Sequence, residues 1–168
     1  EHGGIDTSFT TNAAKLSDRF INEAMHNVSW LKVSFNGGDE ESYASIHRTQ
    51  PKDYSTVLNN LKKANEYRIK NKIQTTLGLQ ILLLPENHHT IKDLCKIAKD
   101  IGLDYVVVKP YSQHRFSNTQ IYKDIDYTEY LSMGESLEKL NSSTFNVVFR
   151  INTIKNWISQ NQERYCKC

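Results

Sequence analysis

The chain has 168 residues, of which 38% are hydrophobic and 24% are charged, and its formal net charge is +2 at pH 7. This length and apolar content are typical of one soluble globular unit with a single hydrophobic core. The basic residues are interspersed with acidic ones and form no run, so nucleic acid is not an expected partner. The longest apolar run, Ile81–Leu84, is too short to cross a bilayer, and we expect no membrane partner.

Cysteine usage indicates a reducing compartment. The three cysteines, Cys95, Cys166 and Cys168, do not make a disulfide framework. Cys95 lies at an apolar position of a predicted helix, where we expect a small buried side chain. The chain opens without an initiator methionine. We therefore expect a cytoplasmic protein, of which this chain is a trimmed or excised part.

The first part of the chain predicts two strands separated by a helix. Residues Ile5–Thr11 alternate in polarity like a strand, and Leu16–Met25 repeats its apolar residues at helical spacing near Ser17, a plausible cap. The next strand, Trp30–Asn36, places its apolar residues on the face expected to meet covering helices. Its other face carries Lys32, Ser34 and Asn36.

The polar face of the Trp30–Asn36 strand is the feature around which we interpret the rest. Barrel strands ordinarily fill their inward face with Val, Ile and Leu, whereas this strand carries an amine, a hydroxyl and a carboxamide. Gly37-Gly38 then leads into an acidic, helix-prone segment that ends in Arg48. The glycine pair lacks the spacing of a phosphate-binding loop and equally fits a plain turn. We interpret this strand end as part of a ligand site.

Two further helix–strand units follow. A helix is predicted from Ser55, as its N-cap, to about Asn71. The strand Ile73–Leu84 comes next, with Gln80 on its polar face, and Pro85 ends it.

The second unit starts with a predicted capping box of Thr90 and Asp93, and its helix ends with Gly102 at the C′ position. The strand Tyr105–Lys109 follows, and Pro110 ends it. Strands that alternate with helices at this spacing imply right-handed crossovers and a parallel sheet. The predicted fold class is α/β, either a doubly wound sheet or part of a barrel.

Beyond Ser112 the pattern is less regular. We predict a loop over Gln113–Ile125, a helix over Tyr127–Leu140, a possible strand over Phe145–Ile151 and a short helix over Thr153–Gln160.

Ligands of parallel α/β folds bind at the carboxyl ends of the strands, and all four predicted ends here are rich in hydrogen-bonding side chains. Lys109 has three interpretations: a Schiff-base lysine, a cation for a substrate carboxylate, or an ordinary salt-bridged lysine. His88-His89 resembles a metal pair only superficially, since adjacent side chains point apart and no third ligand is placed.

Four segments, taken in order, resemble the radical S-adenosylmethionine (radical SAM) superfamily. They are Thr11-Asn12, VSFNGGDEESYASIHR at residues 33–48, LLLPENHHTIKDL at residues 82–94 and DYVVVKPYSQH at residues 104–114. The match is closest to members with a C-terminal, cysteine-rich SPASM extension. The resemblance implies an α/β fold, a partial (β/α) barrel with parallel strands, truncated at its N-terminal side. It implies the barrel part over residues 5–112 and a helical segment leading toward a SPASM-type region over residues 113–168.

The resemblance also implies the roles of individual residues. The strand end at Ser34 and Asn36 would touch S-adenosylmethionine (SAM), and Arg48 would meet its methionine carboxylate. The implied cofactor-binding residues are Asn12, Ser34, Asn36, Arg48, Gln80, Leu82 and Val108. The implied substrate rim is Lys109, Tyr111, Ser112, Gln113 and His114.

The chain departs from the family in its iron site. The family holds a 4Fe-4S cluster on a Cys-x-x-x-Cys-x-x-Cys loop, which this chain lacks, as it lacks the glycine-rich segment that holds the methionine amine. The family's Thr-Asn-Gly turn reads Thr11-Asn12-Ala13, and the usual Asp of the fourth strand is Asn36. Cys166 or Cys168 resembles an auxiliary-cluster ligand of the SPASM region.

The resemblance therefore implies part of an enzyme that reductively cleaves SAM to begin radical chemistry. Its expected partners are a small-molecule or peptide substrate and an electron donor such as flavodoxin or ferredoxin. This piece alone is expected to be inactive, because it lacks the cluster loop. One alternative is an iron-free small-molecule binding or Schiff-base lyase domain that uses Lys109. Another, a non-catalytic interaction domain, is disfavoured by the polar strand ends.

Overall fold

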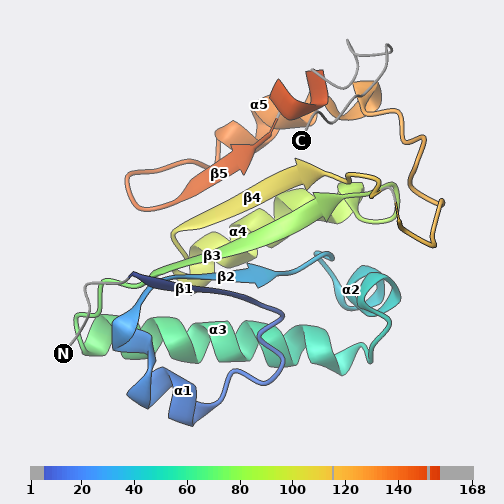
Figure 1. Cartoon of the computed structure of the whole chain (residues 1–168). Coiled ribbons are helices and arrows are strands. Elements are labelled where there is room, and N and C mark those ends of the chain that lie inside the picture. Colours follow the sequence, from blue (N-terminus) through green and yellow to red (C-terminus); the bar gives the residue numbers. More distant parts are fainter. Residues whose placement is uncertain (1–5, 115, 151, 156–168) are drawn as a thin grey trace.

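The computed structural model describes residues 6–114, 116–150 and 152–155 (Figure 1). Within them, five strands form one sheet in the order β1-β2-β3-β4-β5, and neighbouring strands are parallel. The predicted α/β class is confirmed, and the sheet is consistent with a partial (β/α) barrel. The strands are β1 (Thr7–Thr11), β2 (Val28–Ser34), β3 (Thr76–Leu83), β4 (Tyr105–Pro110) and β5 (Asn146–Phe149).

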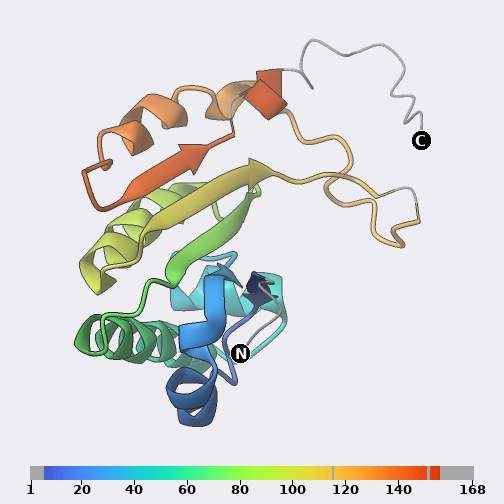
Figure 2. The same cartoon turned by 60° about the vertical axis from the view of Figure 1, so that its left-hand side comes forward.

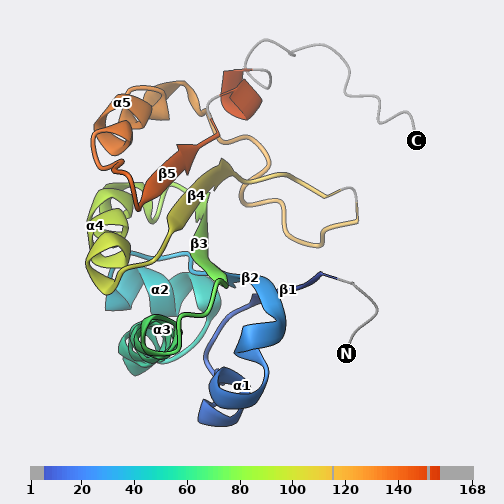
Figure 3. The ribbon, with the colours of Figure 1, turned by 90° about the vertical axis from the view of Figure 1, so that its left-hand side faces the viewer.

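The helices lie on the outer side of the curved sheet. Figures 2 and 3 show this arrangement, with the segment that follows β4 passing over the other side. No helix in the described ranges has the length and apolarity that a membrane span requires. The α-helices are α1 (Asp18–Glu23), α2 (Glu40–His47), α3 (Lys52–Lys70), α4 (Ile91–Ile101) and α5 (Met133–Glu138), and the 3-10 turns are η1 (Met25–Asn27), η2 (His88–Thr90) and η3 (Thr128–Tyr130).

The core lies between the sheet and the helices, because alternate residues of each strand point to the same face. Leu31, Val33 and Phe35 of the second strand segment are at most 1% exposed, as their alternation predicts. On β3, four alternating apolar residues are fully buried, and helices α3 and α4 pack their own apolar stripes against them. These β3 residues are Leu77, Leu79, Ile81 and Leu83.

The predicted start of α3 is wrong. The helix begins at Lys52 instead of after Ser55. The reason is that the Asp53 carboxylate accepts hydrogen bonds from the Gln50 main-chain N–H at 3.2 Å and from the Thr49 hydroxyl, so this carboxylate closes the first turn. The Ser55 hydroxyl instead donates to the Glu40 carboxylate of α2 at 3.0 Å. Ser55 therefore contacts another helix and does not cap α3.

The predicted capping box of α4 is also wrong. The Thr90 hydroxyl donates to the Asn87 carbonyl at 2.8 Å, and it accepts the Gly38 main-chain N–H at 2.9 Å. Asp93 pairs with Lys96 at 2.6 Å. The Thr90 hydroxyl is therefore used in a tertiary contact with Gly38 and does not form the predicted capping hydrogen bond.

The C-terminal part adds a strand to the same sheet. β5 pairs with β4 in parallel, as Val106 opposite Val147 shows, within the predicted Phe145–Ile151 strand. The predicted Tyr127–Leu140 helix is shorter and divided into η3 and α5. Residues 152–155 are helical, and the rest of the predicted Thr153–Gln160 helix lies outside the described residues.

Candidate functional site

Side chains on the face away from the helices line up in rows across the sheet. In one row, Ser34 lies opposite Gln80, Gln80 opposite Val107, and Val107 opposite Val148. We call this side of the sheet the open face. It carries a groove of ≈ 420 Å³, the central groove, lined by Trp30, Lys32, Thr76, Gln80, Tyr105, Val107, Val148 and Arg150. A second, the rim groove, of ≈ 400 Å³, is lined by Leu82, Lys109, Pro110, Tyr111, Ser112, Arg150 and Thr153.

Ser34 and Gln80 are brought together by the register of β2 and β3. Both residues are partly buried. Within the described ranges, neither the hydroxyl nor the carboxamide has a hydrogen-bond partner, although the Gln80 main-chain carbonyl accepts the Phe35 N–H at 2.9 Å. Polar groups at such positions take water or a ligand as their partner. These two are therefore available to a ligand.

Asn36 joins the ends of β2 and β3. Its main-chain N–H donates to His47 Nε2 at 2.9 Å, and its side-chain Oδ1 accepts the Leu82 N–H at 2.9 Å. Its carbonyl accepts a hydrogen bond from Asn87 Nδ2 at 3.0 Å. The Asn36 side-chain oxygen is thus occupied by the fold, and Asn36 shapes the rim as well as lying on it.

Asn87 is a fully buried residue that holds the rim together. Its Nδ2 also donates to the Leu82 carbonyl at 2.8 Å, and its Oδ1 accepts the Leu84 N–H at 3.0 Å. Nothing local indicates that Asn87 reaches across to β2.

Gly37-Gly38 serves close packing. A Cβ on Gly37 would lie 2.2 Å from the main-chain nitrogen of Tyr43, and one on Gly38 would lie 2.2 Å from the main-chain oxygen of Thr90. The Gly38 carbonyl accepts the Tyr54 hydroxyl at 2.7 Å. These contacts fit the interpretation as a plain turn, since the glycines let the loop approach α2 and η2 closely.

Two predicted cofactor residues, Asn12 and Arg48, are exposed and lie in turns. The Asn12 side chain accepts the Ala14 N–H at 3.2 Å, next to Ala13 with φ 54°. Arg48 ends α2 in the left-handed region with φ 53°. Burial raises the pKa of Tyr122, and the Arg48 charge opposes that rise, which places Arg48 near the segment that follows β4.

Val108 points away from the open face. Its side chain is fully buried in the core, whereas its neighbour Val107 lines the central groove. Any contact of Val108 with an adenine ring is therefore limited to its main chain. Leu82 is partly buried and lines the rim groove.

Lys109 lies among other cations. Burial lowers the pKa of its ammonium group, and the charges of Arg150 and Lys32 lower it further. It forms no ion pair with any described residue, so the salt-bridged interpretation finds no support there. A partly buried amine with a lowered pKa can bind an anion or act as a nucleophile.

Of the five predicted substrate-rim residues, three, including Lys109, line the rim groove and two do not. Tyr111 and Ser112 line the rim groove. The Tyr111 main-chain N–H donates to the Tyr127 hydroxyl at 2.7 Å, and that hydroxyl donates to the Leu83 carbonyl at 3.1 Å. Burial raises the pKa of Tyr127 to about 12, so this hydroxyl keeps its proton.

Gln113 and His114 belong to the loop instead, and neither lines a groove described above. Gln113 Nε2 donates to the Thr119 carbonyl at 3.0 Å, and His114 Nδ1 accepts the Phe116 N–H at 3.2 Å. The rim groove therefore unites only part of the predicted substrate set.

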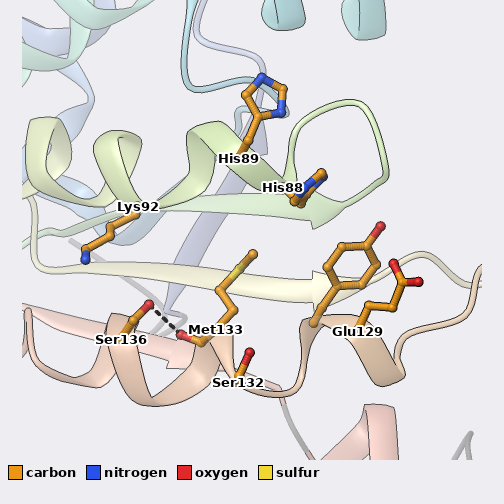
Figure 4. Close-up of a pocket in the computed structure, with 8 residues that line it drawn as sticks. His88, His89, Lys92, Glu129, Ser132, Met133 and Ser136 are labelled. Carbon is orange, nitrogen blue, oxygen red and sulfur yellow. Dashed lines mark hydrogen bonds between the residues drawn. The ribbon is translucent and has the colours of Figure 1, made fainter.

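A cavity of ≈ 500 Å³ lies on the helix side, between η2–α4 and η3–α5 (Figure 4). His88 and His89 line it, with the His88 ring tilted against Tyr130 at 5.2 Å between centroids. His88 Nδ1 lies 2.8 Å from the Pro85 carbonyl. The described residues contain no group of three or more side chains that could hold a metal ion. None of the predicted cofactor or substrate residues lines this cavity.

Cys95 is buried, as predicted, and burial raises the pKa of its thiol to about 12. It packs as a small apolar side chain. Cys166 and Cys168 lie outside the described residues, so their role as cluster ligands stays a prediction.

Two groove residues were missed or undervalued in the sequence. Arg150 follows β5 and lines both grooves, and Lys32 was noted only as a member of a polar strand face. A basic residue at the carboxyl end of a predicted strand was the available signal for Arg150.

Comparison with known proteins places the fold. No protein-family model matches the sequence, and no curated protein does. Similar solved structures include SuiB from Streptococcus suis, with a TM-score of 0.68 and 16% identity over 96% of this chain and 37% of that chain. SuiB bound to S-adenosylmethionine has a TM-score of 0.66 and 17% identity, over 86% of this chain and 33% of that chain. SuiB bound to the precursor peptide SuiA has a TM-score of 0.65 and 17% identity, over 96% of this chain and 36% of that chain.

The N-acetylneuraminate lyase from Mycoplasma synoviae is a weaker match, with a TM-score of 0.50 and 18% identity over 84% of this chain and 45% of that chain. The chain thus spans about a third of SuiB and under half of the lyase. At these identities the likeness establishes the fold alone, an α/β fold that this chain shares with part of SuiB.

Proposed function

We propose that this chain forms one wall of the SAM site of a radical SAM enzyme. The observation that carries the proposal is the Ser34–Gln80 pair, two polar side chains adjacent in register with no hydrogen-bond partner among the described residues. They stand at the carboxyl half of a parallel sheet, where ligands of such folds bind. The structure of SuiB bound to S-adenosylmethionine supports SAM as the ligand of this type of fold.

The residues present suit a nucleoside. A hydroxyl and a carboxamide can bond ribose hydroxyls, and the Val107 side chain beside them offers an apolar surface to a base. The proposed contacts are Asn12, Ser34, Asn36, Arg48, Gln80, Leu82 and the main chain of Val108. Bound SAM supplies the radical chemistry, and the chain binds the cofactor and orients it.

The described residues do not fit a 4Fe-4S cluster. Their one cysteine, Cys95, is buried in the core with a raised pKa, whereas a cluster needs several thiolates. We therefore place the cluster ligands in another part of a longer protein, with Cys166 or Cys168 as an auxiliary-cluster ligand. A flavodoxin or ferredoxin as electron donor and a cytoplasmic location belong to the same proposal. The encoded sequence upstream of Glu1 tests it, because a Cys-x-x-x-Cys-x-x-Cys loop must occur there.

Calorimetric titration of the chain with SAM tests the cofactor site. We expect saturable binding, weakened roughly fivefold to tenfold in Ser34→Ala and in Gln80→Ala, since each loses about one hydrogen bond to the ligand. The matched controls are Ser45→Ala and Gln74→Ala, which alter exposed residues that line neither groove. Equal losses in the controls, or no binding by the unaltered chain, would contradict the assignment.

A Schiff-base lyase is the second candidate, favoured by the lowered pKa of Lys109 and by the likeness to a lyase fold. Borohydride reduction in the presence of small carbonyl compounds tests it. A covalent adduct that persists in Lys62→Ala and disappears in Lys109→Ala supports the lyase. The radical SAM proposal expects no adduct.

A further inference from the structure

The central and rim grooves share a cationic lining. Arg150 lines both grooves, Lys32 lines the central groove and Lys109 lines the rim groove. No aspartate or glutamate of the described residues lines either groove. Unpaired cations that face one another across a groove repel, and an anionic ligand relieves that repulsion.

The floor of the central groove is apolar. Val148 is 46% exposed and Trp30 is 38% exposed, and Tyr105 lines the same groove. The Lys32 Nζ lies 5.3 Å from the centroid of the Trp30 ring. Apolar side chains left open beside charged ones are typical of a binding surface.

The cations are spread along the grooves. Lys32 lies opposite Gly78, which lies opposite Tyr105, whereas Lys109 lies four residues further along β4. At about 3.3 Å per residue, their rows are about 13 Å apart along the strands. That separation is between main-chain positions, and Arg150 lies beside Lys109, because Phe149 is the partner of Val108. A ligand with more than one carboxylate can reach both rows.

We infer that the two grooves together bind an acidic segment of a peptide substrate beside SAM, with its carboxylates on Lys32, Lys109 and Arg150 and its apolar side chains on Trp30, Tyr105 and Val148. The inference rests on the proposed function, whose substrate class it names. An extended peptide that alternates acidic and apolar residues presents both kinds of group at strand spacing. A carboxylate beside Lys109 also favours its charged form, which burial and its cationic neighbours disfavour.

Calorimetric titration with two capped hexapeptides tests the inference. One alternates glutamate with leucine, and the other alternates glutamine with leucine. The variants are the Lys109→Gln, Arg150→Gln double variant and the control Lys62→Gln, which removes an exposed positive charge of α3. All three sites lie at surface or groove positions, and circular dichroism checks that each variant is folded.

We expect the acidic peptide to bind, the neutral peptide to bind at least tenfold more weakly, and the double variant to lose roughly tenfold in affinity. Binding of the acidic peptide should weaken as salt is added, because the contacts are partly exposed. Lys62→Gln should bind like the unaltered chain.

The inference is overturned if the two peptides bind equally, if Lys62→Gln loses as much as the double variant, or if the unaltered chain does not bind the acidic peptide. It is also overturned if pyrophosphate binds more tightly than the peptide, because the grooves would then select a compact phosphate. Titration with SAM in the same variants separates the two proposals. If the peptide binds and SAM does not, the radical SAM proposal is refuted and the peptide site is retained.

Discussion

His47 illustrates how one side chain supports the rim. Its Nε2 accepts the Asn36 main-chain N–H at 2.9 Å, and its ring stacks on Tyr43 with 4.3 Å between centroids. An imidazole nitrogen accepts a hydrogen bond only when it carries no proton. Burial lowers the pKa of His47, which favours this neutral form.

Folding stability should therefore depend on the protonation of His47. Its folded pKa lies below the value of about 6.5 of an unfolded histidine, so the unfolded state takes up the proton first. This contribution to the free energy of unfolding is fully present above about pH 6.5 and is lost as the pH falls through the folded pKa. Urea unfolding at a series of pH values across this range measures it.

The matched variants are His47→Gln and His26→Gln. We expect His47→Gln to lose about 1 kcal/mol at neutral pH and to show a shallower dependence on pH. The His26 side chain is exposed and makes no hydrogen bond within the described ranges, so its variant should follow the unaltered chain. An unchanged pH dependence in His47→Gln would refute the role given to this ring.

The sequence located polar residues at the rim but not their partners. Asn36 and Gln80 were both expected to face a ligand, yet the Asn36 side-chain oxygen bonds Leu82 and the Gln80 carboxamide stays unpaired. Asn87, which makes hydrogen bonds to both strand ends, carried no signal. A hydrogen-bond partner depends on distance in the folded chain, which local polarity does not encode.

At the scale of elements, α3 and α4 end in the same motif with different residues. After α3, the Lys72 N–H donates to the Ile69 carbonyl at 3.2 Å and the Ile73 N–H to the Arg68 carbonyl at 2.9 Å. Gly102 forms the matching bond after α4. Both C′ residues adopt left-handed backbone, with φ 54° at Lys72 and φ 86° at Gly102. Glycine tolerates that conformation, and lysine is strained in it.

Substitutions at Lys72 and Gly102 should change the free energy of unfolding in opposite directions. Lys72→Gly should raise the free energy of unfolding by about 0.5–1 kcal/mol, because the relieved strain exceeds the added freedom of the unfolded chain. Gly102→Ala should lower it by about 1–2 kcal/mol, since its Cβ would also lie 2.6 Å from Asn65 Nδ2. Thermal unfolding of both variants checks this. A gain in Gly102→Ala, or a loss in Lys72→Gly, would contradict the assigned motif.

Element types were predictable, while several boundaries were not. Ser17 caps α1 as predicted, accepting the Phe20 N–H at 3.2 Å. The Ser55 and Thr90 side chains form no capping hydrogen bond, although Thr90 is the N-cap residue of α4. A capping signal is short and recurs by chance in a sequence. Which candidate residue caps the helix therefore depends on its surroundings, such as the Asp53 carboxylate near the start of α3 and the contact of Thr90 with Gly38.

At the scale of the whole molecule, a polar cluster ties α3 to β3 and β4 at the end of the sheet away from the rim. The Arg68 guanidinium pairs with the Asp104 carboxylate and donates to the Thr75 carbonyl at 2.9 Å. Asp104 also accepts the Leu77 N–H at 2.6 Å. Arg68 is only 13% exposed at its side chain. One carboxylate thus pairs with a mostly buried cation and accepts a hydrogen bond from a strand N–H.

Removing that carboxylate should destabilise the fold without changing the rim. Asp104→Ala leaves the Arg68 charge and the Leu77 N–H short of a partner, and we expect a loss of about 2–3 kcal/mol in chemical denaturation. Asp100→Ala, at an exposed position of α4, is the control and should cost under about 0.5 kcal/mol. Similar losses in both variants would show that the cluster contributes little.

By itself, the sequence determined that this protein is a parallel α/β sheet and which face of β2 and β3 meets the helices. Both follow from local periodicity, because every second strand residue shares a face and buried faces must be apolar. Only the tertiary structure decided that β5 extends the sheet, that Val107 and not Val108 lines the groove, and that Lys32 and Arg150 share it. Those outcomes depend on strand register and on where a connection ends, and register is set by packing across the whole sheet.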